Sequence, residues 1–346
     1  NGNYGLNASW TLYNGNKRLK TIQQEKLNNQ VAELDVATSE NSIQESIAQI
    51  YIQILYAAES VRVNENTLQV SIAQRDRGQE LLNAGSIAKS DFAQLEAQVS
   101  TDRYQLVTAQ ATLQDYKLQL KQLLELDGEN EMNIYLPALS DENVLSPLPA
   151  KRDVYVSALA LRPEIEASKL NVNASELGID IAKSGYLPTV SLSAGIGTNH
   201  TSGSDFTFSE QVKNGWNNSI GLSVSVPIFN NRQTKSAVQK AKLQYETSML
   251  SLLDEQKALY KTIEGLWLDA NSAQQRYAAA NEKLKSTQIS YNLISEQFNL
   301  GMKNTVELLT EKNNLLQAQQ EQLQAKYMAI LNMQLLKFYQ GDQLAI

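Results

Sequence analysis

Long stretches without glycine or proline are the feature that most limits what this chain can fold into. Residues 16–77, 86–127 and 302–340 contain neither residue, and residues 228–300 contain only Gly265. Because these two residues are the main interrupters of helices, each stretch predicts one long helix. At 1.5 Å per residue, two of the helices would be roughly 90–110 Å long and the other two roughly 60 Å, several times an ordinary globular helix. Helices of this length must pack lengthwise against one another.

Apolar residues recur with heptad spacing in two of these stretches. In the stretch that ends at residue 127, the 3-4 pattern is interrupted only by Asp102. A narrow apolar seam beside wide polar faces predicts coiled-coil packing. On periodicity alone, a solvated coiled-coil scaffold, acting as an interaction protein, fits the chain best. The seam residues are Phe92, Leu95, Val99, Leu106, Ala109, Leu113, Tyr116, Leu120 and Leu123, and then Leu309, Leu316, Leu323 and Leu331.

Several local patterns occur twice, at one constant offset along the chain. The segment YGLNASWTLYNGNKR matches IGLSVSVPIFNNRQT, which aligns Gly5 with Gly221. The segment NAGSIAKSDF matches NLGMKNTVEL, which aligns Gly85 with Gly301 at the same offset. Such matches predict an internal two-fold repeat in which each copy has a strand, a long helix, a glycine turn and a second helix.

The repeat predicts how the chain is divided. The second copy has an upstream helix at 152–185, with Pro163 near its start, and a β-hairpin at 187–228. Subtracting the offset places the matching helix and strand of the first copy before residue 1, so we expect roughly 65 or more residues upstream of this chain. The predicted parts are a first repeat at 1–130, a linker or equatorial segment at 131–151, and a second repeat at 152–346.

Three segments alternate between apolar and small polar residues, the pattern of half-exposed β-strands. They lie at about 3–12, 187–197 and 218–228. Apolar outer faces with aromatic ends are typical of transmembrane β-barrel strands, and a small soluble sheet with one packed face is the alternative. A charge on the apolar face, as in Val224→Arg, is therefore expected to harm membrane assembly more than Ser223→Arg. The end aromatics are Trp216 at one end and Trp10, Tyr13 and Phe229 at the other.

The composition argues against several classes of function. The net charge of −7 comes from interspersed charges of both signs without a basic run, which argues against a nucleic-acid partner. There is no cysteine, and the single histidine, His200, lies in a Gly/Ser/Thr-rich stretch typical of an exposed loop. The sequence has no window of 18 consecutive apolar residues, so it predicts no transmembrane helix. Without a catalytic set, a phosphate loop or a metal-spaced cluster, the chain is predicted to have no enzyme activity, no cofactor and no metal site.

Together these segments resemble the TolC-like outer membrane factors, the exit ducts of efflux and type I secretion systems. LRPEIEASKLNVNASELGIDIAKSGYLPTVSLSAGIG resembles the family's segment that runs from RPE to LP and the following strand. SVSVPIFNNRQ resembles its strand-to-helix junction, and SWTLYNGNKR is a weaker first-copy version. NAGSIAKSDF and NLGMKNTVELL resemble the two helical turns near the periplasmic tip. The resemblance covers essentially the whole chain and includes the duplication.

The resemblance implies a mainly α fold with a small β part. Long α-helical hairpins, arranged as a coiled-coil barrel, would continue into a transmembrane β-barrel shared by a homotrimer, in which each protomer gives four strands. It also implies an outer-membrane channel of a Gram-negative bacterium with a large periplasmic part, a passive conduit for small molecules or drugs. The implied partners are two further copies, a periplasmic adaptor, an inner-membrane pump and outer membrane lipid.

The resemblance also implies candidate residues at the periplasmic entrance. Glu307 matches an acidic-ring position, Lys303 a basic residue that locks the entrance, and Asp91 an acidic partner on the other hairpin. Phe298 stands where the family type has tyrosine, and Thr310 stands where it has a second acid, so two of the family's polar groups are missing here. The alternative is that Asp91, Lys303 and Glu307 are ordinary solvated helix residues.

Two further groups of residues mark changes of direction in the chain. Gly85 and Gly301 are predicted to turn the chain at the tip. At the strand-to-helix junction of the second copy, Pro227 closes the strand ladder because it has no N–H, and Asn230 is placed to cap the helix. The predicted junction residues are Tyr13, Asn14, Pro227, Phe229 and Asn230.

Overall fold

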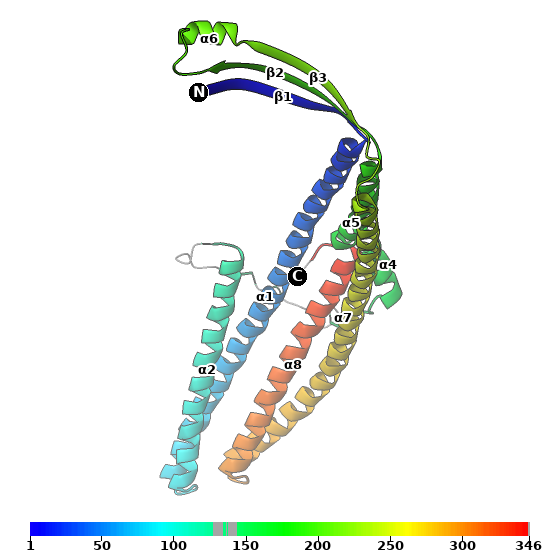
Figure 1. Ribbon diagram of the computed structural model, residues 1–346. Helices are drawn as coiled ribbons and strands as arrows, with labels where there is room; N and C mark the ends of the chain where they lie inside the picture. The colour runs from blue at the N-terminus through cyan, green and yellow to red at the C-terminus, as the bar shows by residue number, and fades with distance from the viewer. Residues whose placement is uncertain (127–133, 136, 138–143, 345–346) are drawn as a thin grey trace. The chain divides into compact units, whose positions relative to one another are not determined.

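The computed structural model describes residues 1–126, 134–135, 137 and 144–344 (Figure 1). The chain divides into two units, which are described separately. The first unit joins Asn1–Ala37 to Pro163–Lys257, and the second joins Thr38–Arg162 to Ala258–Ile346. The predicted linker at 131–151 lies largely outside the described residues, and the division of the chain into two repeats stays a prediction.

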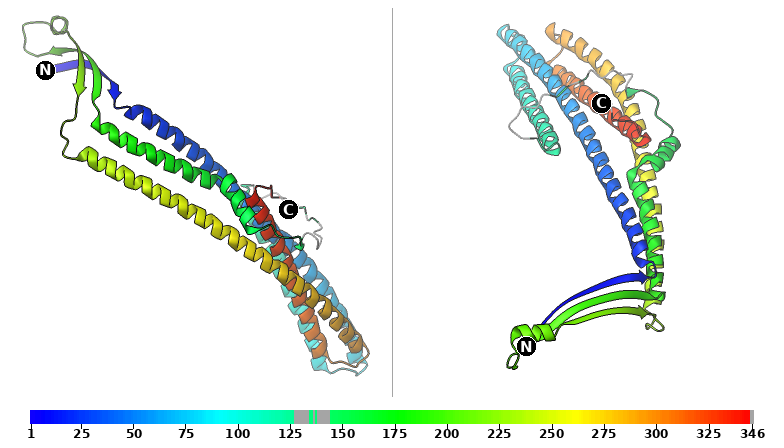
Figure 2. Two further views of the ribbon diagram at one scale, coloured as in Figure 1. Left: turned by 90° about the vertical axis from the view of Figure 1, so that its right-hand side faces the viewer. Right: turned by 90° about the horizontal axis from the view of Figure 1, so that it is seen from above.

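The first unit contains a three-stranded antiparallel sheet in the order β1-β2-β3 (Figures 1 and 2). All three predicted strands are confirmed, but β2 begins at Thr189 and β3 ends at Ser225, inside the predicted hairpin bounds of 187 and 228. Thr189 pairs with Ser225 at one end of the ladder, and Pro188 and Pro227 lie just beyond that end, where a proline has no N–H with which to continue the ladder. The strands are β1 (Gly2–Asn14), β2 (Thr189–His200) and β3 (Asn217–Ser225).

The register brings the large apolar residues of the strands onto one face of the sheet. Trp10 pairs with Leu192, which pairs in turn with Leu222. A bulge between Thr11 and Tyr13 returns Tyr13 to the same face. The other face carries only Gly, Ser, Asn and Thr. The apolar residues are exposed, with Leu6 at 73% and Ile220 at 84% of their full accessible surface, so no core of this chain covers the apolar face along these strands.

Helices extend from the sheet in the first unit. The N-terminal part of α1 (Lys17–Asn83) lies beside α5 (Pro163–Lys183): Gln24 Nε2 donates to the Ala174 carbonyl at 2.8 Å, and Lys20 pairs with Asp180 at 3.4 Å. α7 (Gln233–Asn299) begins beside the short 3₁₀ helix η1 (Ser184–Tyr186). The short helix α6 (Phe208–Asn214) lies between β2 and β3. None of the helices in the described part of the chain is long and apolar enough to cross a membrane.

The helix bounds repeat with the offset found in the sequence. α1 runs from residue 17 to 83 and α7 from 233 to 299, so each has 67 residues and both ends fall at positions that the repeat aligns. α2 (Lys89–Leu123) and α8 (Thr305–Gln340) likewise begin at aligned positions. The local signals that start these helices therefore occur at matching positions in both halves of the chain.

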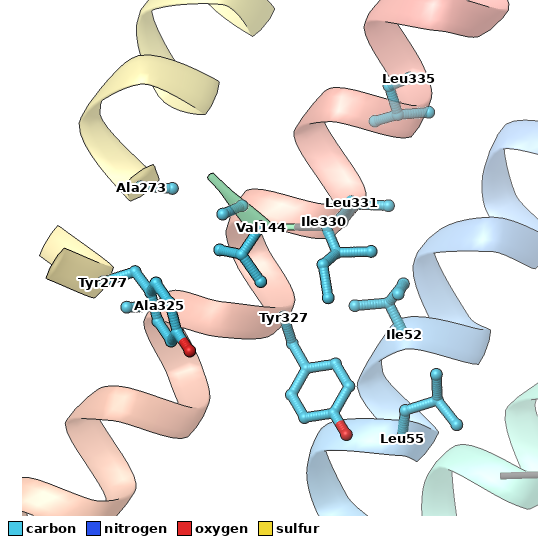
Figure 3. Packing of buried hydrophobic residues seen from close by; sticks show 11 residues of the cluster. Ile52, Leu55, Val144, Ala273, Tyr277, Ala325, Tyr327, Ile330, Leu331 and Leu335 are labelled. Carbon is cyan, nitrogen blue, oxygen red and sulfur yellow. The ribbon is translucent and has the colours of Figure 1, made fainter. Parts of the chain in front are cut away.

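The core of the second unit surrounds the C-terminal half of α8 (Figure 3). Side chains from α1, α7 and the segment at Val144 meet it there. The predicted α8 seam is confirmed only in part: Leu331 is buried, whereas Leu309, Leu316 and Leu323 are half-buried. Because several elements contact α8, burial does not follow one narrow stripe. The α8 residues that are buried instead include Leu308, Lys312, Leu315 and Ala318, followed by most of residues 325–339.

The helix predicted at 152–185 is two helices. α4 (Lys151–Leu161) ends before α5 begins at Pro163. Arg162 between them is extended, with φ −75° and ψ 124°, because the proline ring disfavours helical backbone in the preceding residue. Arg162 pairs with Glu45 at 2.9 Å and its guanidinium lies 4.1 Å from the centre of the Tyr339 ring, which holds this break in the second unit against α1 and α8.

Candidate functional site

The two predicted turns are glycine turns that end α1 and α7 in the second unit. Gly85 and Gly301 have positive φ values of 74° and 75°. In each turn the glycine N–H and the next N–H donate back to carbonyls of the preceding helical turn, at 2.8–2.9 Å. A Cβ at either glycine would meet nothing within 4 Å. The left-handed backbone of this C-terminal cap, rather than crowding, therefore explains why glycine stands at both positions.

The residues after each turn cap the next helix. Glu307 N–H donates to Asn304 Oδ1 at 2.9 Å, while Asn304 N–H donates to Glu307 Oε2 at 3.2 Å, which is a complete capping box. At the matching turn, Ala88 N–H donates to Asp91 Oδ2 at 3.3 Å, but the alanine side chain has no acceptor for the return bond. Asp91 and Glu307 therefore both act as helix-capping carboxylates.

Lys303 and Glu307 form an ion pair within one turn of the chain. Their Nζ and Oε1 atoms lie 2.5 Å apart, and both side chains are about a third exposed. The bonds from Lys303 and from the Asn304 N–H hold the pKa of Glu307 below its usual value. A lowered folded pKa means that this stabilisation is present above the ordinary carboxyl pKa of about 4.3 and is lost as the pH falls through the lower folded value.

The predicted entrance residues are only partly brought together within one chain. The described residues record no ion pair between Asp91 and Lys303, since Lys303 pairs with Glu307 instead. Thr310 is exposed and Phe298 is 2% exposed. The capping role of Asp91 and Glu307 was missed in the sequence, although N-x-x-E at residues 304–307 is a readable cap signal.

Phe298 belongs to a small apolar core close to the two glycine turns. It packs with Leu95 and Leu308, which are 1% and 0% exposed. Beside this core, Gln74 Nε2 donates to the Tyr291 hydroxyl at 2.8 Å. Since these residues come from α1, α2, α7 and α8, the core joins the two helical hairpins of the second unit.

One cluster of polar residues was missed as a site. Ser71 of α1, Asp102 of α2 and Lys312 of α8 are 2%, 1% and 3% exposed. Lys312 Nζ donates to Ser71 Oγ and to Asp102 Oδ2, and Ser71 Oγ donates to the same carboxylate oxygen. Burial lowers the pKa of Lys312, and the bond and charge of Asp102 act in the opposite direction. The sequence feature that could have indicated this cluster is Asp102, the residue that interrupts the heptad pattern of apolar residues.

The strand-to-helix junctions share a backbone conformation. Gly15 and Asn16 have φ values of 66° and 64°, and Asn231 and Arg232, the aligned positions of the second junction, have 51° and 61°. In the first junction Asn14 Oδ1 accepts from the Arg18 N–H at 3.3 Å.

The predicted cap at Asn230 is wrong. Its Nδ2 donates to the Thr234 hydroxyl, and the chain uses two left-handed residues before α7 begins at Gln233. Pro227 lies two residues beyond the last paired strand residue, and Phe229 is 84% exposed against 40% for Tyr13. The loop thus makes the change from sheet to helix by backbone conformation rather than by an asparagine cap.

We expect Asn304→Ala to weaken the start of α8 by about 1 kcal/mol, because it removes the acceptor for the Glu307 N–H. Hydrogen exchange of amides 305–308 should quicken accordingly. The converse change, Ala88→Asn, supplies the acceptor that the matching turn lacks and should slow exchange at the start of α2. Equal exchange in the parent and both variants would contradict a capping role.

Known proteins resemble this chain in sequence and in fold. A family profile described as outer membrane efflux protein matches residues 154–341. The outer membrane efflux protein BepC of Brucella suis is 24% identical over 290 residues, which cover 83% of this chain and 60% of BepC. The outer membrane protein TolC of Escherichia coli is 24% identical over 316 residues, which cover 87% of this chain and 62% of TolC. The chain thus spans about 60% of the length of these curated relatives.

Solved structures share the fold over nearly the whole chain. A crystal structure of CusC matches with a TM-score of 0.83 at 19% identity and covers 99% of this chain and 78% of its own. The outer membrane protein VceC of Vibrio cholerae matches with a TM-score of 0.79 at 17% identity, over 99% of this chain and 80% of VceC. The mainly helical fold with a small sheet is therefore the fold of these proteins.

Proposed function

The chain belongs to the outer membrane efflux protein family, and from this premise we propose that it is the exit duct of a tripartite efflux or type I secretion system. In this role the protein lies in the outer membrane of a Gram-negative bacterium and extends a large helical part into the periplasm. It is a passive conduit for small molecules or drugs rather than an enzyme, so the energy for transport comes from its partners.

The two-faced sheet is the observation that carries this proposal. Its apolar face is exposed, whereas a small soluble sheet would pack such a face against a core. On the opposite face, small polar residues bond to the neighbouring strand, as where Ser193 Oγ donates to the Gly221 carbonyl at 3.2 Å. A lipid-facing apolar surface behind a wettable inner wall is typical of a transmembrane barrel. The alternative of a solvated coiled-coil scaffold does not account for this exposed apolar face.

The height of the apolar face also fits a bilayer. The exposed face extends along β1 from Tyr4 to Tyr13. The nine steps between these residues, at about 3.3 Å each and tilted by about 40°, rise about 23 Å, close to the apolar band of roughly 25 Å in outer-membrane barrels. Tyr4 and Trp216 then lie near one interface, with Tyr13 and Phe229 near the other, where aromatic residues are enriched.

The sheet edges support a homotrimer. Within the described residues, β1 and β3 each have one unpaired side, and unpaired backbone groups cannot be left in lipid. In the proposed assembly, each protomer contributes four strands, among them β1, β2 and β3, to a shared 12-stranded barrel. The two helical hairpins of each protomer, which we propose arose by duplication, give six hairpins that close a coiled-coil tube.

We expect the full-length protein to be extracted only with detergent and to behave as a trimer in light scattering, because the barrel closes only when three protomers pair their edges. A detergent-free control extraction should leave it in the membrane fraction. A monodisperse monomer with undiminished thermal stability would contradict the trimer, and release without detergent would contradict the membrane location.

The glycine turns form the periplasmic entrance in this proposal. A periplasmic adaptor bridges them to an inner-membrane pump, and outer membrane lipid surrounds the sheet. Glu307 recurs three times around the axis and favours cations there. Lys303 pairs with Glu307 within this chain, and we propose that its lock with Asp91 forms in the assembled trimer, between hairpins of neighbouring protomers.

We expect Glu307→Gln to weaken cation preference and block by multivalent cations in planar bilayers, because it removes the negative ring. Glutamine can still accept the Asn304 N–H bond, so this variant keeps the capping box while it removes the charge. Lys303→Ala and Asp91→Ala should raise single-channel conductance if the proposed lock holds the closed state. If all of these variants conduct and select like the parent, the residues are ordinary solvated helix residues; failure of the parent protein to form channels would contradict the duct itself.

A further inference from the structure

The connection between β2 and β3 is tied together by its own hydrogen bonds, with α6 at its centre. Thr207 and Glu210 form a complete capping box at the start of the helix. Gln211 joins the helix to both flanking segments, since its Nε2 donates to the Phe206 carbonyl at 2.8 Å and its Oε1 accepts from the Thr201 N–H at 2.9 Å. The connection therefore has a defined conformation of its own.

α6 packs against the same face of the sheet as the large apolar side chains. Tyr4, Thr198 and His200 belong to that face, because Thr198 pairs with Tyr4 and His200 lies two positions beyond Thr198 in β2. Thr198 Oγ1 donates to the Val212 carbonyl of α6 at 2.9 Å. The Phe208 ring lies 6.3 Å from the Tyr4 ring, edge to face, and 5.0 Å from the His200 ring. These contacts place α6 on the apolar side, at the end of the sheet away from the long helices (Figure 1).

Aromatic side chains around α6 stay exposed in spite of these contacts. Phe208 is 55% exposed, and Tyr4, Phe206 and Trp216 are exposed by 54–60%. Aromatic rings gathered at the end of an apolar face are typical of a membrane–water interface, where the ring contacts hydrocarbon and its polar edge contacts the headgroups. The aromatic residues of the connection therefore extend the end of the apolar face sideways, beyond the strands.

The two edges of α6 differ in polarity. Phe208 and Val212 are four residues apart and share the edge next to the sheet, whereas Glu210 and Lys213 share another edge and are exposed. A helix with one aromatic edge and one charged edge lies in the plane of a membrane surface, with the first edge towards the hydrocarbon and the second in water. The aromatic edge of α6 is continuous with the face of the sheet proposed to contact lipid, so both would contact the same bilayer.

We propose that the β2–β3 connection is an interfacial anchor, in which α6 lies beside the barrel at the outer surface of the outer membrane and its aromatic residues contact the lipid headgroups. This inference rests on the proposed duct function, which supplies the lipid-facing sheet. Because the long helices extend into the periplasm in that proposal, the end of the sheet with α6 is the outer end. The rise of about 23 Å along β1 then brings Tyr4, and with it Phe208, to the level of the headgroups.

The depth of spin labels in vesicles of phosphatidylethanolamine and phosphatidylglycerol tests the anchor without any transport assay. The chain has no cysteine, so Phe208→Cys takes a single nitroxide, whose apolar ring replaces the phenyl ring. In the reconstituted full-length protein, EPR power saturation should show that this label collides more often with oxygen, which concentrates in lipid, than with a nickel chelate, which stays in water. The matched label at Lys213→Cys, on the charged edge of the same helix, should show the opposite preference.

Two further labels separate failure of the anchor from failure of the duct. Trp216→Cys lies outside α6 and should also prefer oxygen, so it reports the level of the connection even if Phe208→Cys disturbs the helix. Ile220→Cys, in the middle of the apolar face, should prefer oxygen most strongly. If the Ile220→Cys label prefers oxygen and neither the Phe208→Cys nor the Trp216→Cys label does, the anchor is overturned and the duct stands. If the Ile220→Cys label prefers the nickel chelate, the sheet does not face lipid, and both proposals are overturned.

Discussion

Replacing Asp102 by leucine is expected to lower the free energy of unfolding by about 3–5 kcal/mol, the largest effect of any single substitution considered for this protein. The change removes the carboxylate that accepts from Lys312, Ser71 and Gln98. Lys312, 3% exposed, is then left as a charge without its counterion. Guanidinium unfolding of the purified protein in detergent, followed by circular dichroism, measures the loss.

The matched control is the double variant Asp102→Leu/Lys312→Leu. It removes both charges, and a buried ion pair replaced by apolar residues is often neutral or stabilising. We therefore expect the double variant to regain most of the stability lost by Asp102→Leu. A double variant as unstable as the sum of the two single variants would contradict the view that an unpaired buried charge causes the loss.

Ile220→Arg is expected to make the free energy of folding into the membrane less favourable by about 2–4 kcal/mol, far more than Ser219→Arg does. Ile220 is paired with Ala194, which is paired with Ala8, in the middle of the apolar face. A charge there would lie near the bilayer midplane, whereas the Ser219 side chain lies on the small polar face. Folding into vesicles at a series of denaturant concentrations measures the difference.

The register changes where the most harmful position on this face lies. Val224, which sequence alone suggested for this test, pairs with Val190 in the row nearest the junction. Val224→Arg should therefore cost only about 0–1 kcal/mol, as expected near an interface. Equal effects of Ile220→Arg and Ser219→Arg would contradict a lipid-facing surface on this sheet.

Features with short-range causes could be predicted from the sequence. The strand faces follow from a period of two, so Leu222 and Ser223 fall on opposite faces whatever the neighbouring strand is. The turns at Gly85 and Gly301 follow from the left-handed backbone that only glycine adopts without strain. The helix at 152–185 was misread despite a local signal, because the effect of Pro163 on Arg162 was overlooked.

Features that depend on several elements meeting in space could not be predicted. Phe298 was predicted at the entrance by its place in the sequence, but its burial depends on Leu95 and Leu308 from two other helices. The buried residues of α8 were predicted only in part for the same reason, since α8 is contacted from more than one side.

What the sequence by itself determined was therefore the set of elements: strand faces, helix lengths and turns, all of which depend on periodicity and backbone preference over a few residues. Only the tertiary structure decided that the heptad interruption at Asp102 has its partner in Lys312, 210 residues later. From the sequence alone, a charged residue in a helix is predicted to be solvated, because its surroundings are unknown. Whether it is buried and paired depends on three helices converging on one point, and no local pattern encodes that convergence.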